Sequence, residues 1–325
     1  MNVLLVRADG IGDALVCAPL IAALVRAGHE ISAVLGAGNC DAFAPHVFAR
    51  VHILERIPWP AHGSTPQSRA RALADARAAR YDVALVASEE IDAYAFARDA
   101  GIATRVGFTT GLAKPFKSLR MRSLVTDAIG RPASAGRARE HEVATLFRLG
   151  ARFVAESAPT RDVARLRALV IGSPDVAPER GAIALQTSHK FAVRGLDRAV
   201  FVACAQRLRA RGDDVLVLGD DAVFADEIAH ASGARTTGML DVSRWKMAIA
   251  SARALVTGDS GAAHVAGMTG VPTVDAFAPG PATAHDIRRW SPWAAPSRAL
   301  VLDPSRDPGA TARALVDALD DVLAA

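Results

Sequence analysis

Cysteine is scarce in this sequence. The 325 residues include three cysteines, Cys17, Cys40 and Cys204, which lie far apart and in apolar surroundings. A disulfide framework needs paired cysteines in an oxidising compartment, so this pattern excludes one and indicates reduced thiols in a cytoplasmic protein. The histidines also lack the spacing of metal ligands, and the sequence therefore predicts no metal site.

Long apolar runs and aromatic residues are also few. Arg7, Asp9 and Asp13 interrupt the first apolar stretch, and no run approaches the ~20 residues that a membrane-spanning helix needs. The chain opens directly on an expected strand, residues 2–6, so we expect no secretory signal. Aromatic residues make up 5%, with two Tyr and four Trp. That is too few for the stacking surfaces that hold single strands, so we expect no nucleic-acid partner.

Positive charge is concentrated in one segment. The whole chain has a net charge of +4, whereas residues 110–139 alone carry seven cationic residues and one acid. The cationic residues are Lys114, Lys117, Arg120, Arg122, Arg131, Arg137 and Arg139. Apolar residues are interleaved with them, so the segment fits an anionic partner: nucleic acid, an anionic membrane surface, or a phosphorylated or acidic-sugar acceptor. A solvated loop without a partner is the alternative.

Strand and helix patterns alternate along the chain, which predicts the α/β fold class with parallel, doubly wound sheets. The expected strands include residues 2–6, 31–35, 51–57, 82–87 and 105–108, and then 182–186, 215–218, 254–256 and 273–277. We expect two Rossmann-like domains, residues 1–155 and 181–325, joined by a linker over residues 156–180 that contains a short helical piece, residues 161–170. The carboxyl ends of the two sheets would face each other across a cleft.

A glycine-containing loop follows the first expected strand. Gly10 and Gly12 keep the turn open at the carboxyl end of that strand, where ligands of open α/β sheets bind. No third glycine follows, and no acid clearly ends the strand over residues 31–35, so the pattern argues against an NAD site. Asp13 closes the loop, either as a functional carboxylate or as the cap of the following helix.

A second junction of this kind lies between residues 256 and 272. Its loop contains Asp259, Ser260 and Gly261, and a helix of small residues that includes Ala262 and His264 follows. A helix start directs unpaired N–H groups and the positive end of the helix dipole at one spot, which favours binding of an anion such as phosphate. An ordinary strand-to-helix turn, with a capping side chain and a buried histidine, is the alternative.

With both loops placed, the sequence resembles glycosyltransferase family 9, the ADP-heptose:lipopolysaccharide heptosyltransferases. Residues 4–15 and 259–266 carry the resemblance, and the segments 105–108, 187–190 and 270–272 are similar to the family as well. The resemblance implies a GT-B fold, an inverting transfer and no essential metal. The lack of a convincing Asp-x-Asp motif beside a strand agrees with the last point.

The resemblance also implies roles for individual residues. It places the catalytic base at Asp13, whose carboxylate would take the proton of the acceptor hydroxyl. The groups expected to stabilise the leaving ADP are Thr187, Ser188, Lys190, Ser260, Gly261, Ala262 and His264. Asp259 would bind sugar hydroxyls, Asp220 or Asp221 the ribose, and Met239 would lie near the adenine. Lys190 could instead be an ordinary surface lysine.

Three departures from the family pattern concern the donor. The family commonly has a Trp shortly after the lysine, where this chain has residues 191–195, beginning with Phe191. The acid after the second strand of the second domain is often Glu, whereas the candidates here are Asp220 and Asp221. Ala278 replaces a usual Gly. These differences put the identity of the donor in doubt more than the transfer chemistry.

The resemblance assigns the acceptor to the N-terminal domain. The expected acceptor residues are Gly10, Gly12, Lys114, Lys117, Arg120 and Arg122. The expected partners are a nucleotide-sugar, with ADP-heptose as donor, and an anionic lipopolysaccharide acceptor of the Kdo-lipid A type, with peripheral association at the inner face of the cytoplasmic membrane. Two alternatives remain: a GT-B glycosyltransferase with another nucleotide-sugar and glycan acceptor, or a catalytically inactive nucleotide-binding or interaction module.

Overall fold

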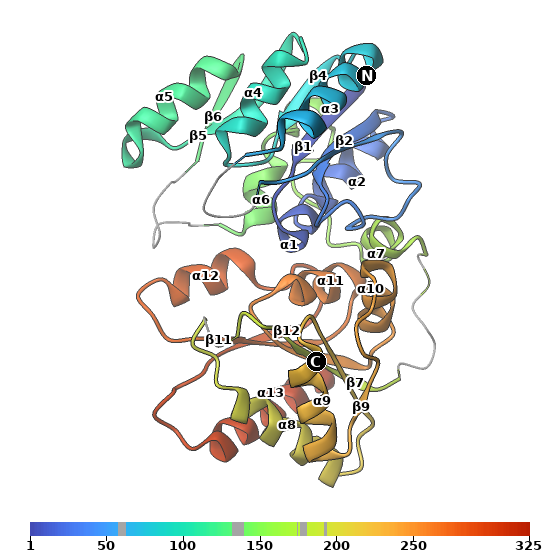
Figure 1. Ribbon diagram of the computed structural model, residues 1–325, viewed down its shortest axis with the longest axis vertical. Helices are drawn as coiled ribbons and strands as arrows, with labels where there is room; N and C mark the ends of the chain where they lie inside the picture. The colour runs from blue at the N-terminus through green and yellow to red at the C-terminus, as the bar shows by residue number, and fades with distance from the viewer. Residues whose placement is uncertain (58–62, 132–139, 174, 176–180, 192–193) are drawn as a thin grey trace. The chain divides into compact units, whose positions relative to one another are not determined.

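The computed structural model describes residues 1–57, 63–131, 140–173, 175, 181–191 and 194–325. These residues form two compact units, Met1–Arg161 and Asp162–Ala325, and each unit contains a parallel β-sheet with flanking helices (Figure 1). Among the described residues, no helix is both long and apolar enough to cross a membrane.

In the first unit, six described strands pair in the order β3-β2-β1-β4-β5-β6, and every pairing is parallel. The strands are β1 (Asn2–Arg7), β2 (Glu30–Gly36), β3 (Val51–Leu54), β4 (Val83–Val86), β5 (Thr104–Thr109) and β6 (Asp127–Gly130). The helices are α1 (Ile11–Leu15), α2 (Ala18–Arg26), α3 (Pro66–Ala79), α4 (Ile91–Asp99), α5 (Pro115–Leu124) and α6 (Glu142–Phe147), with 3₁₀ turns η1 (Gly111–Ala113) and η2 (Ala151–Phe153). Helices α3, α4 and α5 share a core with β1 and β4 on one face. Helices α2 and α6 pack together on the other, where Gly150 lies beside Leu20 and Leu85.

The second unit repeats this plan, with six described strands in the parallel order β12-β11-β10-β7-β8-β9. The strands are β7 (Ile183–Thr187), β8 (Val215–Gly219), β9 (Arg235–Thr236), β10 (Ala254–Gly258), β11 (Thr273–Phe277) and β12 (Ser297–Val301). The helices are α7 (Val163–Ile171), α8 (Arg198–Ala210), α9 (Ala222–Ser232), α10 (Val242–Ala250), α11 (Gly261–Thr269), α12 (Thr283–Trp290) and α13 (Pro308–Ala324). Helices α8, α9 and α13 share one core with the sheet, while α7, α10 and α11 form a second group that packs together.

The two sheets have the same topology. Numbered from the first strand of each unit, both strand orders read 3-2-1-4-5-6, the order of doubly wound nucleotide-binding folds. The strand order reverses between β1 and β4 in one sheet and between β7 and β10 in the other. Ligands of such sheets bind at the carboxyl ends of the strands at this switch point. The predicted α/β class with two doubly wound parallel sheets is therefore confirmed.

Several local predictions need correction. The helix expected from residue 14 to 26 is divided into α1 and α2, because Pro19 has no N–H and the N–H of Cys17 bonds to the carbonyl of Ala14 at 2.9 Å. The strand expected over residues 51–57 ends at Leu54. The expected linker over residues 156–180 contains α7, which packs on α10 and α11 and so belongs to the second unit.

The basic segment is more ordered than a solvated loop. Residues 110–130 form η1, α5 and β6, where α5 begins with Pro115 at a position that needs no N–H donor. Met121 and Leu124 anchor α5 in the core, with 0% and 1% of their surfaces exposed. Residues 132–139, which include Arg137 and Arg139, lie outside the described residues.

Candidate active site

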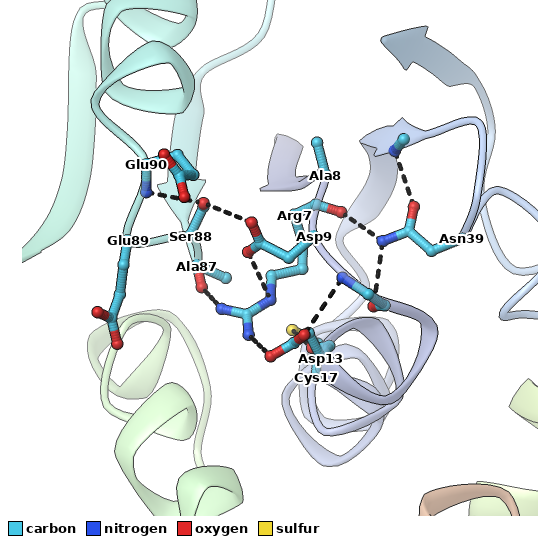
Figure 2. Close-up of polar contacts among 12 residues, drawn as sticks. Arg7, Ala8, Asp9, Asp13, Cys17, Asn39, Ala87, Ser88, Glu89 and Glu90 are labelled. Atoms are coloured by element: carbon cyan, nitrogen blue, oxygen red, sulfur yellow. Dashed lines mark hydrogen bonds and ion pairs between the residues drawn. The ribbon is translucent and has the colours of Figure 1, made fainter. Parts of the chain in front are cut away.

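A buried arginine organises the glycine loop that follows β1 (Figure 2). Arg7 ends β1 and is 3% exposed. Its Nη2 donates to Oδ1 of Asp13 at 2.7 Å, and its Nε lies 3.3 Å from Oδ2 of Asp9. Its Nη1 donates to the carbonyl oxygen of Ala87, the residue after β4. Burial lowers the pKa of Arg7, but the two carboxylates outweigh burial and raise the pKa, so the guanidinium stays charged.

Asp13 lies in the first turn of α1 with both carboxylate oxygens held. Oδ1 accepts from Arg7, and Oδ2 accepts from the backbone N–H of Gly10 at 3.2 Å. A Cβ at Gly10 would lie 2.9 Å from Oδ2, so any other residue here would displace the carboxylate of Asp13. The Asp13 side chain remains 36% exposed. Gly10 is the N-cap of α1 and Asp13 is its third residue, so the prediction of Asp13 as the N-cap is wrong. The carboxylate instead accepts from the N-cap N–H and presents a fixed, partly open face.

Asp9 and Asn39 hold the same loop in place. Oδ1 of Asp9 accepts from Oγ of Ser88 at 3.3 Å and lies 3.3 Å from Nη1 of Arg56. Burial raises the pKa of Asp9, while Arg7 acts in the opposite direction. Asn39 is fully buried and donates to the carbonyl oxygen of Arg7 at 3.0 Å. The switch point of the first sheet is thus tied together by contacts from β1, β2 and β4.

In the second unit, the loop after β7 contains Ser188 and Lys190. Oγ of Ser188 donates to Oδ2 of Asp220 at 3.3 Å and accepts from the backbone N–H of Lys190 at 3.2 Å. The Lys190 side chain is exposed and makes no ion pair with any described residue. Thr187 is buried, and its hydroxyl donates to the carbonyl oxygen of Leu218 at 3.1 Å. The hydroxyl hydrogen of Thr187 is therefore already used in this bond and is not free for the predicted phosphate contact.

The junction of β10 and α11 lies at the switch point of the second sheet. Gly258 ends β10, where a Cβ would lie 2.4 Å from Cδ1 of Leu196. Nη1 of Arg194 lies 3.0 Å from Oδ2 of Asp259 and also donates to the carbonyl oxygen of the same residue. Ser260 is the N-cap of α11, but its hydroxyl bonds to Thr257 Oγ1 at 3.0 Å and not to the helix.

Helix α11 is buried along almost its whole length. Among the described residues, no side chain caps its N-terminus, so the first N–H groups, which include those of Gly261 and Ala262, keep their donors for another partner. His264 is 5% exposed, and its ring meets the edge of Trp290 with centroids 5.9 Å apart. A Cβ at Gly267 would lie 2.7 Å from the backbone nitrogen of Trp293, so the helix packs directly on backbone.

The residues predicted to bind the nucleoside lie on different elements of the second unit. Asp221 is the N-cap of α9 and lies 3.0 Å from Arg198, so it has a structural task. Asp220 joins two loops, because it also accepts from the backbone N–H of His189 at 3.0 Å, and its Oδ2 lies 2.8 Å from Nδ1 of the same residue. Met239 lies in the loop before α10 and is 62% exposed.

The four predicted acceptor cations gather on one element, which is a helix and not a loop. Lys114 precedes α5, while Lys117, Arg120 and Arg122 lie on it. Arg131 does not belong to this surface: it is 7% exposed and bonds to both carboxylate oxygens of Glu142 at 2.6 Å.

Sequence reasoning missed three residues that the structure makes prominent. Arg7 and Arg194 each hold a predicted site carboxylate. Asp275 on β11 is fully buried, and neither of its carboxylate oxygens has a hydrogen-bond partner among the described residues. Burial, reinforced by Asp259, raises the pKa of Asp275 well above its ordinary value, while Arg194 opposes the shift. The sequence signal that could have identified Asp275 is its position as an acid in the middle of the apolar run 273–277.

The described residues contain no group of three or more His, Cys, Asp or Glu side chains that could hold a metal ion. The thiol of Cys17, beside α1, is fully buried, and this burial raises its pKa to about 12. It is therefore neutral near pH 7 and is suited to packing rather than to nucleophilic chemistry.

Comparisons with known proteins agree with the two-unit fold. Three solved structures are similar over nearly their whole length: the E. coli heptosyltransferase WaaC with ADP (TM-score 0.78, 16% identity, 99% of this chain and 100% of that chain), the E. coli ADP-heptose lps heptosyltransferase II (0.72, 17%, 100% and 99%), and a glycosyl transferase family 9 protein from Veillonella parvula (0.73, 13%, 99% and 97%). At these identities the likeness shows the fold, which is that of the GT-B glycosyltransferases. No curated protein sequence matches the chain.

The sequence itself assigns the family. The profile of glycosyltransferase family 9 (heptosyltransferase) matches residues 69–312. The chain therefore belongs to glycosyltransferase family 9 and is a glycosyltransferase.

Proposed function

We propose that this protein transfers heptose from ADP-heptose to the inner core of lipopolysaccharide, with inversion at the anomeric carbon. The observation that carries the proposal is the carboxylate of Asp13, which is held on both oxygens and is still 36% exposed at the switch point of the first sheet. Family membership supports it. The E. coli heptosyltransferase of similar fold has been solved with ADP and with ADP-2-deoxy-2-fluoro heptose, which favours the same donor class here.

Asp13 is the general base of this mechanism. The oxygen of an acceptor hydroxyl forms a bond to the anomeric carbon while the bond from that carbon to the ADP oxygen breaks, and the hydroxyl proton passes to Asp13. A hydroxyl is a poor nucleophile near pH 7, and a positioned base typically contributes ~100–10,000-fold. Arg7 directs the carboxylate, because it is buried and its Nη2 donates to Oδ1 of Asp13 at 2.7 Å.

The second unit binds the donor in this proposal. Negative charge grows on the β-phosphate as ADP leaves, and the uncapped start of α11 is suited to stabilise it. The proposed phosphate contacts are Ser188, Lys190, Ser260, Gly261, Ala262 and His264. Asp259, oriented by Arg194, would bind sugar hydroxyls, and Asp220, Asp221 and Met239 would lie near the nucleoside. These groups would do the work of a metal, so we propose that the transfer needs none.

The first unit binds the acceptor in this proposal. Gly10 and Gly12 lie with Asp13 at the start of α1, and Lys114, Lys117, Arg120 and Arg122 offer positive charge to an acceptor of the Kdo-lipid A type. An acceptor of this kind is part of a membrane, so we propose peripheral association with the inner face of the cytoplasmic membrane.

Calorimetric binding and a transfer assay test the proposal together. We expect ADP and ADP-heptose to bind in preference to UDP and GDP sugars, and ADP to be released when a Kdo-lipid A acceptor is added. The departures at Phe191 and Ala278 favour one alternative, a different nucleotide-sugar. Selective binding of a UDP or GDP sugar would establish that alternative, and no binding of any nucleotide would point to an inactive module.

A further inference from the structure

The outward face of η1 and α5 carries three large apolar side chains that no described residue covers. Leu112 is 95% exposed, Phe116 is 88% exposed and Leu119 is 70% exposed. They follow one another at spacings of four and three residues, so Phe116 and Leu119 share one face of the helix. Met121 and Leu124 fix the opposite face in the core. The fold therefore exposes this apolar face to solvent, and the face packs against no described part of the chain.

Two arginines flank the same face, and two lysines lie at the start of the helix. Lys114, Lys117, Arg120 and Arg122 make no ion pair with any residue that the structure describes. The sequence between residues 110 and 126 contains no Asp or Glu. With about 100° per residue, Arg122 falls on one side of the Phe116–Leu119 face and Arg120 on the other.

Helices α3 and α4 differ from α5 in having Asp side chains that pair with two of their arginines. On α3 and α4, Arg69 pairs with Asp92 at 3.2 Å and with Asp99 at 2.7 Å. Arg98 also pairs with Asp99, at 2.6 Å. Arg69 and Arg98 are thus neutralised within the fold, whereas the cations of α5 keep their charge for an external partner.

We infer that η1 and α5 form an interfacial anchor, in which Leu112, Phe116 and Leu119 enter the headgroup and acyl boundary of an anionic bilayer. Apolar side chains rimmed by lysine and arginine are the pattern of helices that lie in this interface. The cations meet anionic headgroups while the apolar face is buried in lipid. A second copy of the chain does not fit the face, because it would bring four cations against four cations.

This inference rests on the proposed function only because the proposed acceptor is part of a membrane. Its test therefore uses vesicles without acceptor or donor: phosphatidylcholine alone, and phosphatidylcholine with about 30% phosphatidylglycerol. We expect flotation to recover the full-length protein at least about tenfold better with the anionic vesicles at about 0.1 M salt. Transfer to a soluble, delipidated acceptor fragment would test the enzymatic proposal separately.

Two sets of substitutions separate insertion from simple charge attraction. F116S/L119S keeps all four cations, and we expect about fivefold or greater loss of binding if the apolar face inserts. K114Q/K117Q/R120Q/R122Q keeps the apolar face, and we expect its residual binding to lose its salt dependence. The controls change exposed residues of the second unit: Val223→Ser, which is 78% exposed, and Arg235, Arg244, Arg298 and Arg306 together to Gln, each of which lies beside an Asp.

The depth to which the apolar face enters the bilayer is measured with one further variant. Phe116→Trp places an indole on the face, and brominated lipid should quench its added fluorescence relative to wild type in anionic vesicles. Equal binding of F116S/L119S and wild type, or an added indole fluorescence that brominated lipid leaves unquenched, would overturn insertion. Failure of the wild-type protein to bind anionic vesicles would overturn the anchor altogether, as would binding that the Arg-to-Gln control weakens as much as the α5 set.

Discussion

The two strand-to-helix junctions at the switch points are built alike and filled differently. At the β1–α1 junction the chain supplies its own anion, because the Asp13 carboxylate accepts from Gly10 at the start of α1 and from Arg7. At the β10–α11 junction the N-cap Ser260 turns its hydroxyl to Thr257, and no described side chain caps the helix. One junction therefore presents a carboxylate, and the other presents free donors.

This difference matches the two halves of a group transfer. An acceptor hydroxyl needs a base, and a departing phosphate needs donors that are already in place. A strand-to-helix junction of this topology can supply either the base or the donors, depending on whether an acid occupies the first turn of the helix. Substitutions that exchange or remove these features are therefore the sharpest tests of the comparison.

The largest effect is expected from Asp13→Asn. Asn keeps one acceptor oxygen for the N–H of Gly10, so the first turn of α1 can form while the base is lost, but it cannot also accept from Arg7. We expect kcat for transfer to fall by ~100–10,000-fold, with donor binding by calorimetry unchanged. Asp75→Asn, at an exposed position of α3, should retain full activity. A rate for Asp13→Asn within twofold of wild type would show that Asp13 is only a helix cap.

Arg7→Met should affect stability most. Arg7 is 3% exposed and faces both Asp9 and Asp13, so its loss leaves Asp13 without its cation and Asp9 with Arg56 alone. Breaking a buried pair costs about 3–5 kcal/mol, and we expect the lower end because both acids are partly exposed. Urea unfolding measures the loss. Arg7→Lys keeps the charge and should recover part of it, whereas equal stability of Arg7→Met and wild type would contradict the proposed role.

At the second junction, Lys190→Ala should lower kcat by about tenfold to a hundredfold, with a smaller change in donor affinity. The expected effect is moderate because the Lys190 side chain is exposed, and water weakens its field. The single-turnover rate of ADP release gives the measurement. Arg298→Gln removes a similarly exposed charge of the same unit and serves as the control. If both variants lose the same activity, Lys190 is an ordinary surface lysine.

Both junctions could be predicted from the sequence, because short apolar runs followed by glycine and a helical stretch mark the carboxyl ends of parallel strands. The residues that hold each junction in place could not be predicted from the sequence. Arg7 bonds to the carbonyl of Ala87, 80 positions away, and only the pairing of β1 with β4 brings them together. Helix α5 was missed for another reason: its outward face carries Phe116 and Leu119, so its apolar residues do not follow a single stripe.

The smallest expected effect is on the pH dependence of stability, and it concerns Asp275. This residue lies on β11, beside β10 of the second junction. This carboxyl is fully buried on β11, and its pKa is raised well above the ordinary value by burial and by Asp259. The unfolded chain releases the proton near pH ~4, while the folded protein retains it until its own higher pKa is reached. Between these two values the folded state binds more protons, so the free energy of unfolding falls as pH rises.

The slope for one such proton is about 1.4 kcal/mol per pH unit, and Asp275→Asn removes it. We expect the variant to gain stability over wild type progressively above pH ~4, and the difference to level off once Asp275 ionises in the folded state. Urea unfolding from pH 4 upward measures this, with Asp317→Asn at an exposed position of α13 as a control whose offset should not vary with pH. A constant offset for Asp275→Asn would mean that the carboxyl is ionised in the fold, and that the β10–α11 junction carries a negative charge beneath its donors. Such a charge would weaken the junction as a phosphate site, so the same titration also tests the contrast with the β1–α1 junction.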